Sequence, residues 1–149
     1  MPLPEPIFGD QEIQKALETV QNDDNPDGWF LLSYAGERSN KLVLFAEGKE
    51  GLEELKGKLA DNQVLYGYQR IEYNNDTESK RVKFVVVVWI GPEVKVMRRA
   101  RVSVEKGGVI EKLGPHVTVN ASDRGDLVRD DVVKQLRKNG GADYNGGRG

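Results

Sequence analysis

The sequence contains no cysteine and only one histidine, His116, among its 149 residues. The absence of cysteine excludes disulfide bonds, thiol catalysis and thiolate metal sites. His116 follows a proline and precedes the run Val117-Thr118-Val119, which predicts that it begins a short strand. Because no nucleophile signature such as Gly-x-Ser-x-Gly accompanies this histidine, the sequence predicts neither a catalytic site nor a bound cofactor.

The sequence also lacks any run near the ~20 apolar residues that a membrane helix requires. Its opening residues, Met1-Pro2-Leu3-Pro4-Glu5-Pro6, lack the basic and apolar regions of a signal peptide, so we expect a cytoplasmic protein. With 38% hydrophobic and 31% charged residues, the composition fits one soluble globular domain. We expect a flexible lead at residues 1–9, the folded domain at 10–139 and a tail at 140–149.

An acidic turn imitates one half of a calcium site. Asp23, Asn25, Asp27 and Gly28 match positions 1, 3, 5 and 6 of an EF-hand loop. Position 12 should supply a bidentate glutamate, but Tyr34 stands there, at the end of a strand-like run where a second helix should begin. The sequence therefore predicts an ordinary acidic turn and no metal ion.

The net charge of −2 conceals two halves of opposite sign. Residues 1–79 carry 16 acidic and 7 basic side chains, a net charge of −9, whereas residues 80–149 carry 8 acidic and 15 basic ones, a net charge of +7. A basic half suits an acidic protein, nucleic acid or an anionic membrane as partner. Its cations gather in three segments: Lys80, Arg81 and Lys83; Lys95, Arg98, Arg99, Arg101 and Lys106; and Lys134, Arg137 and Lys138.

Nucleic acid is the main alternative partner for such a basic half. Proteins that bind single strands interleave cations with aromatic side chains on which the bases stack. After Trp89 the only aromatic residue of this chain is Tyr144, near its end. We therefore keep a nucleic-acid-binding module as the alternative function and do not expect nucleic acid as the principal partner.

The first basic segment, Lys80, Arg81 and Lys83, comes just before an unbroken apolar run from Phe84 to Ile90. A β-branched run without polar alternation, closed by a Gly-Pro pair, predicts a central strand that is covered on both faces. The three cations then lie at the solvent end of a rigid strand, where they can face an acidic partner. The alternative interpretation is a solubilising turn beside an apolar strand.

Hydrophobic periodicity predicts helices and strands along the whole chain. Between Pro92 and Lys106 the valines nearly alternate with polar residues, so this pattern by itself favours a strand. Before this segment we predict a helix capped by Asp10 with Ile13, Ala16, Leu17 and Val20 on one face, strands at Trp29–Tyr34 and Leu42–Phe45, a short helix with Leu52, Leu55 and Leu59, a strand at Val64–Tyr73 and a turn at Asn74–Ser79. After it we predict a short helix at Val109–Leu113, a strand at Val117–Val119 and a helix that is capped by Asp123 and ends at Gly140.

Four segments carry a family resemblance: the basic turn at 79–81, Lys83-Phe84, Trp89-Ile90-Gly91 and the terminal run Gly140-Gly141-Ala142-Asp143-Tyr144. In this order they resemble the coactosin group of the actin-depolymerising factor homology family, and the resemblance extends from Trp29 to Tyr144. It implies an α/β fold with a mixed sheet of five or six strands, flanked by helices on both faces. It also implies a long helix after the apolar strand, with Pro92 in its first turn. The inner stripe of that helix would consist of Val94, Met97, Ala100 or Arg101, and Val104.

The resemblance implies a non-enzymatic protein that binds along actin filaments in the cytoplasmic cytoskeleton. Lys83 matches the family's filament-contacting lysine, Lys138 matches the lysine of its terminal helix, and Arg99 matches the basic position of its long helix. Lys138 has an equally good alternative role, because a cation complements the dipole at a helix C-terminus. The implied actin-binding residues are Lys80, Arg81, Lys83, Arg98, Arg99, Arg101, Lys134, Arg137 and Lys138.

The chain departs from actin-depolymerising factor and cofilin in its long helix. Those proteins carry a Lys-Met pair where this chain has Arg99-Ala100, and the leading segment lacks their N-terminal regulatory serine. Since the apolar anchor for the actin cleft is missing, we expect weak or no monomer binding and severing, and no control by N-terminal phosphorylation. We expect the protein to be a monomer that binds filamentous actin and no membrane.

Overall fold

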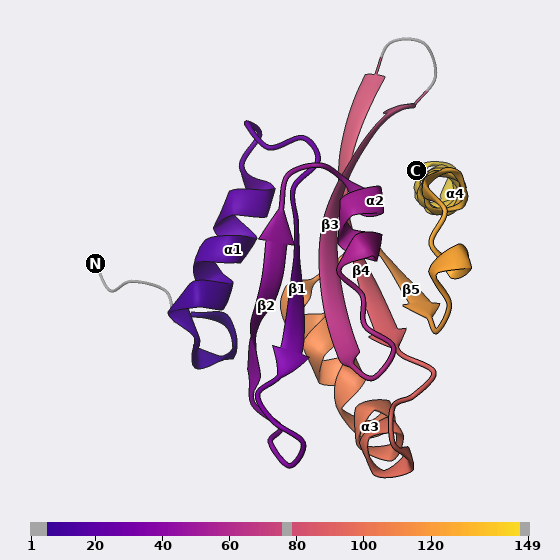
Figure 1. Cartoon of the computed structure of the whole chain (residues 1–149). Coiled ribbons are helices and arrows are strands. Elements are labelled where there is room, and N and C mark those ends of the chain that lie inside the picture. Colours follow the sequence, from indigo (N-terminus) through magenta and orange to yellow (C-terminus); the bar gives the residue numbers. More distant parts are fainter. Residues whose placement is uncertain (1–5, 76–78, 147–149) are drawn as a thin grey trace.

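The computed structural model describes residues 6–75 and 79–146, which form one five-stranded sheet with helices on both faces (Figure 1). In chain order the elements are η1 (Ile7–Gly9), α1 (Gln11–Gln21), β1 (Trp29–Tyr34), β2 (Leu42–Gly48), α2 (Leu52–Gly57), β3 (Val64–Asn75), β4 (Ser79–Ile90), α3 (Val96–Leu113), β5 (Val117–Ala121), η2 (Arg124–Asp126) and α4 (Arg129–Gly146). The first five residues of the lead predicted at 1–9 and the last three residues of the predicted tail lie outside the described part of the chain.

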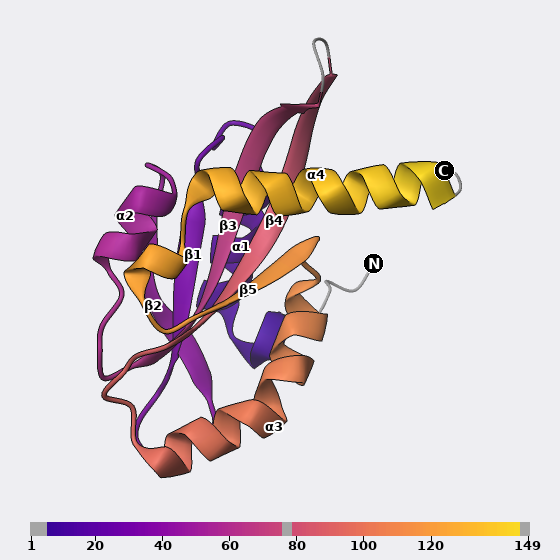
Figure 2. The same ribbon diagram turned by 90° about the vertical axis from the view of Figure 1, so that its right-hand side faces the viewer.

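The sheet is mixed, with the strand order β2-β1-β3-β4-β5. The first three pairings are antiparallel, and β4 pairs with β5 in parallel. Helices α2 and α4 cover one face, while α1 and α3 cover the other (Figures 1 and 2). This three-layer arrangement confirms the predicted α/β fold with a mixed sheet.

Strand β4 is buried on both faces, as its apolar run predicts. Val85, Val87 and Trp89 point into the core under α2 and α4, whereas Val86 and Val88 point into the core under α1 and α3. All five of these side chains are buried. The run lacks polar alternation because both of its faces are covered by helices.

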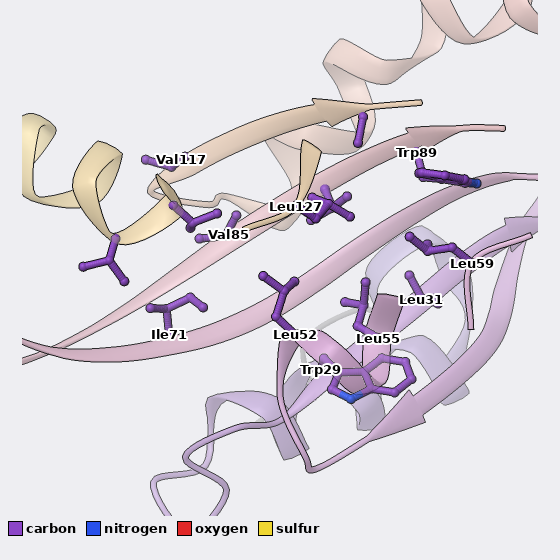
Figure 3. Close-up of a cluster of buried hydrophobic side chains, with 14 of the residues drawn as sticks. Trp29, Leu31, Leu52, Leu55, Leu59, Ile71, Val85, Trp89, Val117 and Leu127 are labelled. Atoms are coloured by element: carbon purple, nitrogen blue, oxygen red, sulfur yellow. The ribbon is translucent and has the colours of Figure 1, made fainter. Parts of the chain in front are cut away.

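The core between the sheet and the helices α2 and α4 contains both tryptophans of the chain (Figure 3). Each buried indole also has a polar partner, because Trp29 Nε1 donates to Glu54 Oε1 at 2.9 Å and Trp89 Nε1 donates to the carbonyl oxygen of Ala60 at 2.8 Å. A buried N–H without such a partner would cost about 1–3 kcal/mol. The two tryptophans therefore join the sheet to α2 and to the loop after it.

The segment with ambiguous periodicity is helical, so the strand that its alternation favours is wrong and the helix implied by the family resemblance is confirmed. Helix α3 begins at Val96, after the N-cap Lys95, so Pro92 lies in the turn before the helix and not in its first turn. The helix continues without interruption to Leu113 and includes the separate short helix predicted there. The predicted inner stripe is right for Val94, which is buried just before the helix, and wrong within it. Met97 and Val104 are exposed, and the buried residues of α3 are Val102, Val109 and Leu113.

Of the two predicted helix caps, one is confirmed and one is wrong. Asp10 caps α1 as predicted, with its carboxylate accepting from the backbone N–H groups of Glu12 and Ile13. Asp123 instead caps the short η2 in a reciprocal capping box, and α4 begins later, at Arg129. Helix α4 passes through Gly140 and ends at Gly146, so the predicted stop at Gly140 is wrong.

Strands β3 and β4 extend together beyond the rest of the sheet (Figures 1 and 2). Their twelve residue pairs form one continuous ladder, from Val64 opposite Ile90 to Asn75 opposite Ser79, without a register shift. Strand β1 pairs with β3 only up to Gln69, and β5 pairs with β4 only from Val85 onward. We call the projecting part, residues 70–75 and 79–84, the β-arm.

Candidate functional site

The base of the β-arm is anchored by a buried arginine. Arg70 is only 1% exposed, and its guanidinium donates to Asp23 Oδ1 at 2.7 Å and to Glu72 Oε2 at 2.8 Å. Its Nη1 also donates to the carbonyl oxygens of Val20 and Gln21, at the C-terminal end of α1. The acidic turn that resembled half of a calcium site therefore supplies a carboxylate to this arginine. These contacts hold the arm against α1.

The two strands of the arm, β3 and β4, are also joined by an ion pair. Lys80 Nζ lies 3.1 Å from Glu72 Oε1, so Glu72 is bound by Arg70 from one side and by Lys80 from the other. Burial opposes ionisation of Glu72, but the hydrogen bonds from Arg70 and Lys80 outweigh it and lower the pKa of this carboxyl. Lys80, a predicted partner contact, is thus 64% exposed and already paired within the arm.

Arg81 and Lys83 lie on the side of the β-arm that faces α4. Residues that are directly opposite in an antiparallel pair point to the same face. Arg81 is opposite Tyr73 and Lys83 is opposite Ile71, and both partners belong to the core under α4. Arg81 is exposed and Lys83 is half-buried, so their charges project along this side of the arm.

Helix α4 lies beside the arm and adds its own cations. Arg137 donates to the carbonyl oxygen of Asn74 at 2.8 Å, and its guanidinium carbon lies 5.5 Å from the centre of the Tyr73 ring. Arg129 donates in the same way to the carbonyl oxygen of Glu72 at 2.6 Å. A groove of about 540 Å³ runs between the arm and α4, and the exposed Lys134 lines it. The arm and α4 therefore form one surface, which we call the arm–α4 surface.

The remaining predicted contacts lie on α3, which begins at the opposite end of the sheet from the arm (Figures 1 and 2). Arg98 and Arg99 are half-buried, and their guanidinium groups donate to backbone carbonyl oxygens of neighbouring turns. Arg101 is exposed. The structure thus separates eight of the nine predicted residues into an arm–α4 group and an α3 group. Arg81, Lys83, Lys134, Arg137 and Lys138 belong to the first, and Arg98, Arg99 and Arg101 to the second. Lys80 belongs to neither, because it alternates with Arg81 along β4 and pairs with Glu72 on the side of the arm that faces α1.

The outer face of α3 carries a row of apolar side chains, of which Met97, Ala100 and Val104 belong to the stripe that the sequence analysis placed inside. Val96, Met97 and Val104 are 79%, 84% and 81% exposed, and Ala100 between them is exposed as well. Their spacing places them on one side of the helix, and we call this row the α3 stripe. The signal that identifies the true inner face is the 7-residue and 4-residue spacing of Val102, Val109 and Leu113.

The single histidine is placed beside the predicted contact Lys83. The backbone N–H of Phe84 donates to His116 Nδ1 at 3.0 Å. In return, the backbone N–H of His116 donates to the carbonyl oxygen of Phe84 at 2.8 Å. The ring lies 6.0 Å from that of Phe84, centre to centre. Burial and the nearby charge of Lys83 lower the pKa of His116. As predicted, the histidine immediately precedes a short strand, β5.

The sequence-family model of the cofilin/tropomyosin-type actin-binding proteins matches residues 7–137 of the chain. The chain belongs to this family. Coactosins from Entamoeba histolytica and Dictyostelium discoideum are each 37% identical to it, over 92% of this chain and 93% of theirs. The family resemblance seen in the sequence is therefore confirmed, and the family consists of actin-binding, non-enzymatic proteins.

Solved structures of this family agree with the fold. The crystal structure of Entamoeba histolytica coactosin superposes with a TM-score of 0.76 at 32% identity, covering 85% of this chain and 92% of that one. Mouse coactosin, described as an actin filament binding protein, superposes with a TM-score of 0.69 at 28% identity, covering 89% of this chain and 91% of that one. No helix within residues 6–75 and 79–146 is long and apolar enough to span a membrane.

Proposed function

We propose that the protein binds along the sides of actin filaments, as a monomer within the cytoplasmic cytoskeleton. The observation that carries this proposal is the arm–α4 surface, where Arg81 and Lys83 of β4 lie on the same side of the sheet as Lys134 and Lys138 of α4. Actin is the partner of the family, and filament binding is the property stated for mouse coactosin. A rigid basic surface is suited to an acidic protein surface.

The nine predicted residues contribute in two ways. The proposed direct contacts are six side chains with an exposed or half-buried charge: Lys80, Arg81, Lys83, Arg101, Lys134 and Lys138. Arg98, Arg99 and Arg137 belong to the same surfaces, but their guanidinium groups bind carbonyl oxygens of this chain. We expect each direct contact to be a charge-assisted pair with an acidic side chain of actin.

The α3 stripe supplies an apolar contact, which the sequence alone did not predict. Its centre is Ala100, at the position where actin-depolymerising factor and cofilin carry methionine. The side chain in the middle of the stripe is therefore shorter than those on either side of it. Met97 and Val104 stand on either side of that position. This shape supports weak or no monomer binding and severing, together with stable binding to the filament side.

Co-sedimentation with actin filaments tests the proposal. We expect saturable pelleting, with much weaker binding to monomers in a native-gel or fluorescence titration. A chain that stays in the supernatant at micromolar filament concentrations contradicts filament binding. Competition with single-stranded RNA at physiological salt separates the two partners, because both kinds of binding weaken with salt. Tighter binding to RNA than to filaments reassigns the basic half to nucleic acid.

A further inference from the structure

The first half of α3 has little apolar attachment to the rest of the molecule. Between Val96 and Lys106, Val102 is the one buried hydrophobic side chain. The other two buried residues, Val109 and Leu113, follow the pair Gly107-Gly108. Both glycines are exposed, and a Cβ added to either would have no atom within 4 Å. Apolar packing alone therefore holds the first half of α3 weakly.

The glycine pair also makes the two halves of α3 easier to bend relative to each other. A glycine in a helix interior costs about 1 kcal/mol relative to alanine, because it has more backbone freedom to lose. Two successive glycines are a known cause of helix bending. Figure 2 shows that α3 changes direction along its length. Other contacts must therefore fix the direction of the first half.

Arg98 attaches the first half of α3 to the turn between β1 and β2. Its Nη2 donates to the carbonyl oxygens of Gly36, Glu37 and Ser39 at 3.0, 2.6 and 3.0 Å. Its guanidinium carbon lies 4.1 Å from the centre of the Tyr34 ring, so the plane of the cation rests on an aromatic side chain. The Arg98 guanidinium is therefore held both through its N–H donors and through its planar face.

Arg99 attaches the same half to the turn that precedes it. Its Nε donates to the carbonyl oxygen of Val94 at 3.0 Å, and its Nη2 donates to those of Gly91 and Pro92 at 3.0 and 3.2 Å. Gly91 is buried and directly follows β4, so this contact connects α3 to the end of that strand. The two arginines thus hold the helix from two sides.

We propose that Arg98 and Arg99 are positioning residues, which hold the first half of α3 so that its apolar stripe faces actin. This inference rests on the proposed function, because the α3 stripe is part of the proposed actin-binding surface. To reach an acidic group on actin, either guanidinium would have to leave several carbonyl oxygens unpaired. Arg101 is the matched contrast, since it lies on the same helix and its side chain is exposed.

The absence of cysteine allows a test of the position of α3 without actin. The variant Ser103→Cys places a single spin label on the exposed side of α3. In this background we expect Arg98→Met and Arg98→Lys to increase the mobility of the label at a temperature where circular dichroism shows both variants folded. Lysine keeps the charge but lacks the planar fork that reaches several carbonyl oxygens. Arg101→Met should leave the spectrum unchanged.

Filament binding of the unlabelled proteins provides the second readout. We expect both Arg98 variants to bind about tenfold more weakly, with the same dependence of log Kd on log salt as the wild type. Arg101→Met should also weaken binding, but with a smaller salt dependence, because it removes a direct charged contact. The same comparison applies to Arg99→Lys and Arg99→Met.

Two results overturn the inference. If Arg98→Lys gives the wild-type label spectrum and wild-type affinity, the charge alone is sufficient and the carbonyl contacts do not position the helix. If Arg98→Met lowers the salt dependence without changing the spectrum, Arg98 is a direct contact. Failure of the wild-type protein to pellet with filaments would contradict the proposed function instead, and the label mobility would still test whether the arginines hold α3.

Discussion

The backbone N–H of Phe84 donates to Nδ1 of His116 over 3.0 Å. Protonation of Nδ1 would break this bond and place a second positive charge beside Lys83. The native structure therefore favours the neutral imidazole, in keeping with the lowered pKa of His116. The unfolded chain binds the proton more readily, with the ordinary pKa of 6.5. This difference makes stability depend on pH through one identifiable side chain.

We expect the free energy of unfolding to decrease as the pH falls from about 6.5 toward the lower pKa of the folded state, because the unfolded chain takes up the additional proton there. Above this range the contribution of His116 is complete. Urea unfolding at a series of pH values measures the slope. His116→Asn keeps an acceptor for the Phe84 N–H but cannot titrate, so its slope should be smaller over this window. Equal slopes for the two proteins would contradict the assignment.

Lys83→Ala should weaken pelleting with actin filaments by about tenfold or more, because a charged interface contact is lost at a half-buried position. The circular dichroism melt should stay nearly unchanged. Lys15→Ala is a suitable control, since this exposed cation lies on α1, away from the arm–α4 surface. If the Lys83 and Lys15 variants pellet equally well, Lys83 is not a principal contact.

Arg70→Met should lower the free energy of unfolding by about 3 kcal/mol, because it leaves the partly buried Glu72 and two carbonyl oxygens of α1 without their donor. Arg38→Met, at an exposed arginine, should change stability by less than about 0.5 kcal/mol. Urea denaturation provides both values. We also expect faster hydrogen exchange in the β-arm of the Arg70 variant, and unchanged exchange there would show that Arg70 does not anchor the arm.

Ala100→Met should increase affinity for actin monomers by roughly tenfold, since burial of a methionine side chain contributes about 1.5–3 kcal/mol relative to exposure. The added side chain fills the low centre of the α3 stripe between Met97 and Val104. The wild-type protein should decorate filaments without accelerating their disassembly. Pyrene-actin disassembly and single-filament imaging measure both properties. Clear severing by the wild type at micromolar concentration would show that residue 100 is not the discriminating feature.

Strand β4 could be predicted from the sequence, whereas the orientation of α3 could not. The run from Phe84 to Ile90 is buried on both faces, so hydrophobicity and burial agree there. In α3 they disagree, because Met97 and Val104 are apolar and exposed. A periodicity argument assumes that apolar residues point inward, and it fails where a protein presents them outward.

The candidate site likewise has a part that the sequence predicts and a part that it does not. Its basic residues could be identified from the sequence, because charge and segment position are local properties. The distinction between Arg98 and Arg101 could not, because the carbonyl oxygens of Gly36, Glu37 and Ser39 are about sixty residues away along the chain. Only the folded structure brings that turn to α3.

The continuous ladder between β3 and β4 decides which side of the β-arm is basic. Side chains alternate along a strand, so the inward direction of Val85 and Val87 also determines the direction of Lys83 and Arg81. No bulge interrupts the pairing between core and arm. One residue inserted into β4 between Lys83 and Val85 would transfer both cations to the opposite side, and two inserted residues would return them. The alternation of inward and outward side chains that is set in the core of β4 therefore continues into the β-arm and determines which side chains the arm presents to a partner.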